Sequence, residues 1–155
     1  MIETFRRAHE HQGAAIVEIY QNCNVFNDGA FDGIIKRDAR AEMMIDLVHG
    51  EPITFGADNQ RGVVMDRGGA RIAEIADVGM DAVAIHDENA PSAAAFALAQ
   101  LASDRMSPTP FGVFRSVTEP EYAQAVSAQL AAANEQQGAG DLAALLRSGA
   151  TWEVE

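Results

Sequence analysis

The sequence is poor in cysteine, lysine and aromatic residues, and each shortage excludes something. A single cysteine, Cys23, cannot form an internal disulfide, so we expect a reducing compartment and a cytoplasmic protein. Lys36 is the only lysine beside ten arginines, and the 23 acidic residues leave a net charge of −12. Because an acidic surface repels phosphate groups, we expect neither nucleic acid nor an anionic membrane as a partner.

Long hydrophobic runs are missing as well. No stretch approaches the ~20 apolar residues that a membrane helix needs, and the first residues lack the apolar run of a signal peptide. Hydrophobic residues still make up 48% of the chain, against 22% charged residues. That balance suits one domain, or one domain with an extension, that buries a core.

The first 23 residues predict half of an α/β repeat. Apolar residues recur at helical spacing over the first ten positions, and Gly13 is placed to end that helix. Residues 14–20 then form a short run rich in β-branched side chains, which favours a strand buried on both faces of a parallel sheet. Residues 21–28 follow as a polar turn, at the sheet edge where α/β proteins bind ligands. The predicted fold class is α/β.

The rest of the chain predicts short strands and then helices. Short apolar runs between residues 43 and 77 are separated by Gly, Asp and Asn, which indicates a small antiparallel sheet or meander. Residues 81–86 predict another strand. Residues 91–103 favour a helix by propensity, and residues 110–115 an extended segment.

Three polar residues are placed to begin helices. Asp28 precedes a short segment that carries Phe31, and Asp141 precedes a leucine-rich segment, so each is a candidate N-cap. Thr118 and Glu121 match the spacing of a capping box before a longer helix. These signals predict a helical end to the chain.

Most catalytic motifs are absent from the sequence. It contains no phosphate-binding glycine loop, no nucleophile elbow and no paired Cys-x-x-Cys. His9 and His11 point to different faces of a helix, which makes them a poor metal pair. His86 beside Asp87 and Glu88 is a candidate general base, although such a group more often closes a turn. We therefore predict no catalytic residue.

Cys23 is the residue most able to carry chemistry. A lone cysteine is most often a small, buried and inert residue. Here, however, three asparagines (Asn22, Asn24 and Asn27) surround it in a polar turn after a predicted strand. Backbone and amide donors in such a turn could stabilise a thiolate or the sulfurs of an iron–sulfur cluster.

The residues around Cys23 resemble a known family. Residues 8–31 read AHEHQGAAIVEIYQNCNVFNDGAF, which is similar to the beta subunit of 2-oxoacid:ferredoxin oxidoreductases. Residues 47–56, 86–88 and 108–115 support this resemblance, which covers most of residues 1–116. The block around Cys23 is its specific part.

The resemblance implies a C-terminal part of a thiamine-diphosphate-binding fold. Residues 1–23 are expected to end the pyrophosphate-binding domain, residues 24–92 to form the beta subunit's C-terminal module, and residues 93–155 a helical extension. Cys23 is expected to ligate a 4Fe–4S cluster whose other three ligands come from the N-terminal half of such subunits. The motif that holds thiamine diphosphate and Mg²⁺ also belongs to that half and is not in this sequence.

The resemblance also implies a reaction and partners. The family decarboxylates a 2-oxoacid oxidatively to an acyl-CoA and passes electrons through the cluster to ferredoxin. The expected partners are the alpha subunit, ferredoxin, coenzyme A and a 2-oxoacid. We expect 2-oxoglutarate, with pyruvate or a broad 2-oxoacid range as alternatives, and no activity of this chain alone. A different class remains open, namely a non-catalytic assembly module in which Cys23 is merely buried.

Overall fold

The computed structural model describes residues 1–102 and 107–152. The chain divides into two compact units, one of residues 1–11 and 15–117, the other of residues 12–14 with the chain from 118 onward. The division at residues 23 and 92 that the resemblance implies stays a prediction.

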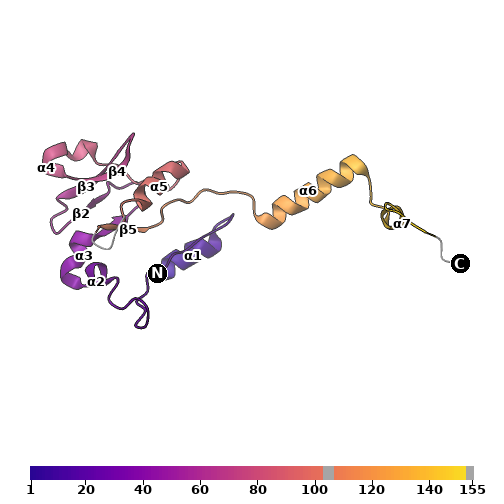
Figure 1. Ribbon diagram of the computed structural model, residues 1–155. Helices are drawn as coiled ribbons and strands as arrows, with labels where there is room; N and C mark the ends of the chain where they lie inside the picture. The colour runs from indigo at the N-terminus through magenta and orange to yellow at the C-terminus, as the bar shows by residue number, and fades with distance from the viewer. Residues whose placement is uncertain (103–106, 153–155) are drawn as a thin grey trace. The chain divides into compact units, whose positions relative to one another are not determined.

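The first unit contains two small sheets (Figure 1). Strands β1 (Met44–Leu47) and β5 (Thr109–Gly112) pair in parallel. Strands β2 (Thr54–Phe55), β3 (Arg61–Asp66) and β4 (Gly69–Glu74) form an antiparallel meander in that order. Helices together with a parallel strand pair confirm the predicted α/β class, and the meander confirms the short strands predicted from the turn residues.

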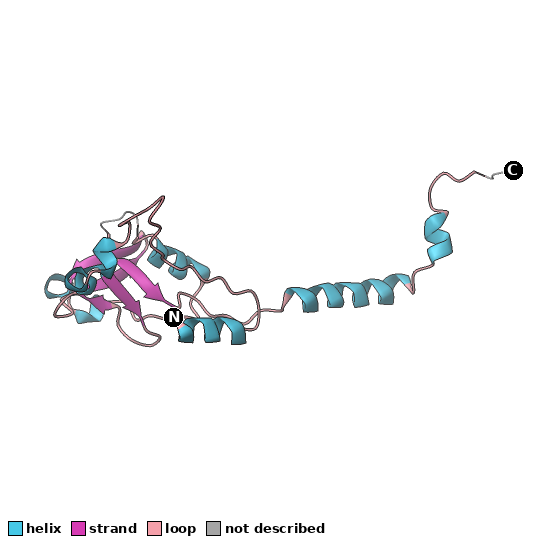
Figure 2. Ribbon diagram, turned by 90° about the horizontal axis from the view of Figure 1, so that it is seen from below, coloured by secondary structure: helices cyan, strands magenta, loops and turns pink. Residues whose placement is uncertain are grey.

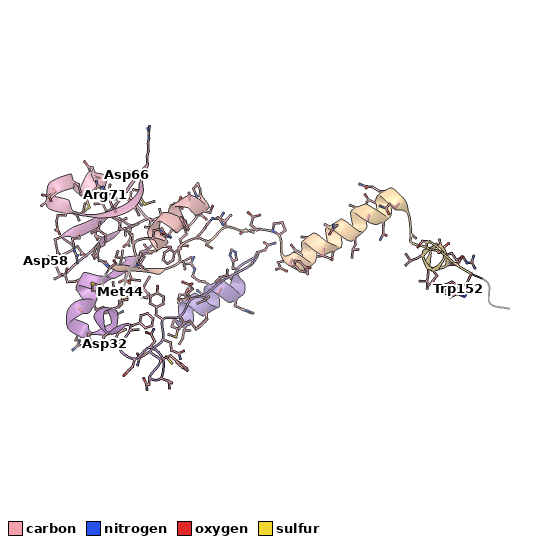
Figure 3. All side chains as sticks on the ribbon, in the orientation of Figure 1. Asp32, Met44, Asp58, Asp66, Arg71 and Trp152 are labelled. Atoms are coloured by element: carbon pink, nitrogen blue, oxygen red, sulfur yellow. The ribbon has the colours of Figure 1, made fainter. Side chains whose placement is uncertain are left out.

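A two-residue turn sets the register of β3 and β4. Asp66 lies opposite Gly69, and the backbone N–H of Gly68 donates to Asp66 Oδ1 at 2.7 Å. Gly69 has a φ of +115°, which a side chain would disfavour. Arg71 Nε lies 3.5 Å from Asp66 Oδ2 at the same hairpin (Figure 3).

The core lies where both sheets meet helix α5 (Ser92–Ala99), which packs against β4 and β5 (Figure 2). Along β1, Ile45 and Leu47 point inward while Asp46 points outward, the two-residue period of a half-buried strand. Ile45 has no exposed surface. The buried cluster comprises Ile45, Leu47, Ile53, Phe55, Val63 and Leu98.

The first unit contains further helices. Helix α1 (Ile2–Glu10) matches the predicted first helix. Helices α2 (Asp32–Ile35) and α3 (Arg37–Met43) follow each other before β1, and α4 (Ile75–Val78) and the 3₁₀ turn η1 (Met80–Ala82) follow β4. In the described ranges 1–102 and 107–152, no helix combines the length and apolar character needed to cross a membrane.

The second unit consists mainly of helices α6 (Tyr122–Gln137) and α7 (Leu142–Leu146). Asp141 caps α7 as predicted, because its side chain accepts hydrogen bonds from the first-turn N–H groups. The capping box of α6 is formed by Glu121 and Gln124, so the prediction that placed it at Thr118 was wrong. Neither helix buries a side chain.

The predicted buried strand at residues 14–20 was wrong for this structure. These residues form no strand, and Ile16 is 92% exposed. A strand exists only when a neighbour accepts and donates its hydrogen bonds, and the described part of the chain supplies no such neighbour to this run. The apolar, β-branched composition is thus present without the sheet.

Other expectations need smaller corrections. β1 belongs to the parallel pair and not to the meander. Residues 81–86 form no strand: η1 takes up the start of this segment, and a single bridge joins Ile85 to Pro52. The backbone bonds of the segment are divided between two partners, since Ala84 N–H donates to the carbonyl of Val63 while His86 N–H donates to the carbonyl of Glu51. α2 begins after Phe31 without a side-chain cap, so Asp28 does not cap it. Ser103, the predicted end of the helix that begins near residue 91, lies outside the described residues.

Candidate functional site

Cys23 opens a tight turn that closes at Asn27. The carbonyl of Cys23 accepts a hydrogen bond from the backbone N–H of Asn27 at 2.9 Å, and the two residues form an isolated antiparallel bridge. Cys23 is half-buried and its thiol is free. The turn therefore holds the sulfur at a fixed place near the surface.

The side chain of Asn22 holds this loop together. Its Nδ2 donates to Asn24 Oδ1 at 2.8 Å and to Asp28 Oδ1 at 3.0 Å. Its Oδ1 accepts from the backbone N–H of Gly29 at 3.0 Å. The side chain of Asn22, which precedes Cys23, is thus bonded to three residues that follow Cys23. These bonds fix the turn without involving the sulfur.

Backbone amides stabilise the thiolate of Cys23. The N–H groups of Phe26, Val25 and Asn27, in decreasing order of effect, hydrogen-bond to the sulfur and lower the pKa of the Cys23 thiol, while slight burial opposes them. The thiolate is the form that binds metals. Of the backbone and amide donors expected from the sequence around Cys23, the backbone groups are the ones that act on the thiol.

Aromatic contacts anchor the loop to the strands. Tyr20 stacks on Phe31 with ring centroids 4.9 Å apart and meets Phe111 of β5 edge-on at 5.5 Å. These rings, with Met44, Arg40 and neighbouring isoleucines, line a cleft of about 210 Å³. The two ends of the Cys23 loop are therefore joined to the core through Tyr20.

The Cys23 turn fits one corner of an iron–sulfur cluster. A thiolate that receives several N–H hydrogen bonds is the donor that such clusters use. Within residues 1–102 and 107–152, however, no group of three or more His, Cys, Asp or Glu side chains could hold a metal ion. The described residues therefore fit the cluster with one ligand and cannot hold it alone.

His86, Asp87 and Glu88 serve the packing around β1 and β5. His86 is buried, and its Nε2 donates to the carbonyl of Val113 at 2.8 Å. The backbone N–H of Glu88 donates to His49 Nδ1 at 3.2 Å, and Asp87 lies 3.8 Å from the same nitrogen. These contacts agree with the turn-closing interpretation of the three residues.

The carboxylate of Glu88 anchors α1. Arg7 of α1 donates to its two oxygens at 3.0 and 2.5 Å, and Glu88 is buried. Hydrogen bonding to Arg7, supported by the charge of Arg7 and opposed by burial, lowers the pKa of Glu88. No local sequence pattern predicts this pair, because 81 positions separate the two residues.

His9 and His11 lie at the C-terminal end of α1. His9 lies exposed in the last turn of α1, and His11 follows as its C-cap.

Fold and site together define an α/β chain in which backbone N–H groups lower the pKa of a single cysteine thiol in a surface turn. Comparison with curated proteins gives this chain a relative, the 2-oxoglutarate oxidoreductase subunit KorB of Mycobacterium tuberculosis. The two proteins are 40% identical over an alignment of 158 positions, which covers all of this chain and 42% of the relative. The resemblance predicted from the residues around Cys23 is thereby confirmed.

That alignment covers less than half of the relative, so the relative contains much that this chain does not. No family model matches the chain. No solved structure matches it. The relationship therefore rests on the 40% identity to the oxidoreductase subunit over the whole of this chain.

Proposed function

We propose that this chain is part of the beta subunit of a 2-oxoglutarate:ferredoxin oxidoreductase and supplies one cysteine ligand, Cys23, to a 4Fe–4S cluster. The complex converts a 2-oxoacid and coenzyme A to an acyl-CoA and carbon dioxide, and ferredoxin receives the electrons. An alpha subunit and the thiamine-diphosphate site, with its Mg²⁺, lie outside these residues. The chain by itself is inactive.

The observation that carries this proposal is the Cys23 turn in a chain 40% identical to an oxidoreductase subunit. Three successive N–H groups favour the thiolate of Cys23. A packing cysteine needs no such donors, because a neutral thiol is a weak acceptor that fits an apolar core. The geometry therefore favours a metal ligand over the alternative of an assembly module with an inert cysteine.

The chain's own residues would position the cluster and tune it. When bound, a 4Fe–4S cluster accepts and donates single electrons. The amides of residues 25–27 would hold negative charge at the sulfur, and Asn22 would keep those amides in place. Hydrogen bonds to cluster sulfurs are among the features that set reduction potentials.

The substrate proposal is 2-oxoglutarate, as in the name of the relative. The cleft beside Tyr20 is lined mainly by apolar side chains with Arg40, and nothing in it selects among 2-oxoacids. Steady-state assays of the complete complex with 2-oxoglutarate, pyruvate and a branched 2-oxoacid test this part. A higher kcat/KM for pyruvate than for 2-oxoglutarate would contradict it.

Iron analysis of the native complex tests the role of Cys23. The complex is purified without oxygen through a tag on this chain, as wild type and as Cys23→Ala. We expect the variant to lose the cluster's iron, sulfide and visible absorbance while thiamine diphosphate stays bound. Full cluster content in Cys23→Ala would refute the proposed ligand, and the absence of any catalytic partner in the purified wild type would favour the assembly module.

A further inference from the structure

The tip of the Cys23 turn exposes its apolar side chains. Val25 is 80% and Phe26 is 91% exposed, and both lie inside the tight turn that the 2.9 Å bond from Asn27 N–H to the Cys23 carbonyl closes. Single exposed apolar residues are ordinary on protein surfaces. Val25 and Phe26 are different, because they are adjacent and follow the proposed cluster ligand, Cys23, by two and three positions in the same turn.

The other cluster ligands decide what reaches this tip. A 4Fe–4S cluster is held by four cysteine thiolates, and this chain has no cysteine besides Cys23. Three thiolates must therefore come from polypeptide outside these residues. That polypeptide has to approach the cluster, and through it the turn, closely enough to contact residues 25 and 26.

We infer that Val25 and Phe26 form a hydrophobic cover, packed against the segment that supplies the other three thiolates, and that this cover keeps water and oxygen from the cluster. The inference rests on the proposed function. Covering the side chain of Phe26 also provides hydrophobic free energy for the docking of that segment. Val25 and Phe26 are positioning residues, since their side chains act on the cluster through solvent exclusion.

A matched pair of variants tests the cover. Phe26→Ala removes the ring at the tip and keeps the backbone N–H, whereas Phe96→Ala removes a ring on α5 that is also exposed, at 68%. Both complexes, with wild type, are purified without oxygen through a tag on this chain. Iron and sulfide are measured first, and the loss of the cluster's visible absorbance is then followed in air.

We expect the cluster of Phe26→Ala to bleach several-fold faster than that of wild type, and the cluster of Phe96→Ala to bleach at the wild-type rate. Loss of iron before air exposure in Phe26→Ala alone would also support the cover. A wild-type bleaching rate in Phe26→Ala, or equal acceleration in both variants, would overturn it. Failure of the proposed function is distinguishable, because it shows as full cluster content in Cys23→Ala.

Discussion

Two apolar runs of similar composition lie in opposite environments in this chain. In β1, Ile45 is fully enclosed, because β5 pairs with the strand and α5 contributes to the same core. In residues 14–20, Ile16 and Ile19 are exposed and the backbone belongs to no sheet. Apolar, β-branched composition thus predicts where a strand can form, and a neighbouring strand decides whether it does.

The two regions also differ in what holds them. The β1 region depends on burial of apolar side chains. The Cys23 loop that follows residues 14–20 depends on hydrogen bonds from Asn22 and on the ring of Tyr20. The β1 region is therefore held by a buried apolar cluster, whereas the region around Cys23 exposes apolar side chains, among them Val25 and Phe26. The predictions below test this contrast.

Truncation of Ile45 should have the largest effect on stability. Ile45→Ala leaves a cavity between β1 and the rest of the core, which typically costs about 2–5 kcal/mol. Ile16→Ala should change the stability of the chain by less than about 0.5 kcal/mol, because the side chain is exposed. Urea unfolding followed by circular dichroism measures both, and similar losses in the two variants would contradict the contrast.

Gly112 of β5 should be the most sensitive glycine. It has a φ of +134°, and a Cβ there would lie 2.7 Å from the carbonyl oxygen of Leu47 in β1. We expect Gly112→Ala to cost more than about 2 kcal/mol, from backbone strain and overpacking together. Gly50→Ala is the control, because Gly50 also has a positive φ but has open space around it. This variant should therefore show only the cost of the backbone strain, about 1–2 kcal/mol.

The Arg7–Glu88 pair should give the chain an acid-sensitive contribution to stability. The folded-state pKa of Glu88 is lowered, so the contribution is present above the ordinary carboxyl pKa and is lost as pH falls through the folded value. Glu88→Gln should cost about 1–3 kcal/mol at neutral pH, and its difference from wild type should shrink in acid. Urea unfolding at several pH values measures this.

Glu3→Gln is the matched control for that pair. Glu3 also bonds an arginine, Arg6, but both side chains are exposed on α1. Solvent screens such a pair, so its loss should be negligible. If Glu3→Gln and Glu88→Gln had equal effects at neutral pH, the anchoring of α1 by Glu88 would be wrong.

Local signals in the sequence predicted much of this fold. Glycines and aspartates between residues 43 and 77 indicated the meander, and Asp141 indicated the start of α7, because turns and caps depend on adjacent residues. The pairing of β1 with β5 could not be predicted, since more than sixty residues separate the strands and no local pattern specifies a partner. Helix α3 was missed because its charged sequence lacks an apolar stripe.

The sequence indicated where the candidate site lies, but not which groups contact the sulfur. The asparagines around Cys23 indicated a polar, donor-rich turn, and the structure has one. Their side chains, however, brace the loop, while backbone N–H groups contact the sulfur. Which group a donor reaches depends on the conformation of the turn, which composition does not specify. The role of Cys23 as an iron ligand stays a prediction.

The smallest expected effect concerns the Cys23 thiol itself. Phe26→Pro deletes the N–H with the largest influence on the sulfur, whereas Phe26→Ala removes the ring and keeps that N–H. The pH dependence of Cys23 alkylation by iodoacetamide reports the thiol pKa, since the thiolate is the reactive form. We expect a midpoint below that of an ordinary cysteine in wild type and Phe26→Ala, and a higher one in Phe26→Pro. Equal midpoints in all three proteins would show that the backbone N–H of Phe26 does not act on the sulfur. The physical basis for assigning Cys23 to a cluster would then be lost. The expected order of midpoints would instead trace the lowered thiol pKa to that single N–H group.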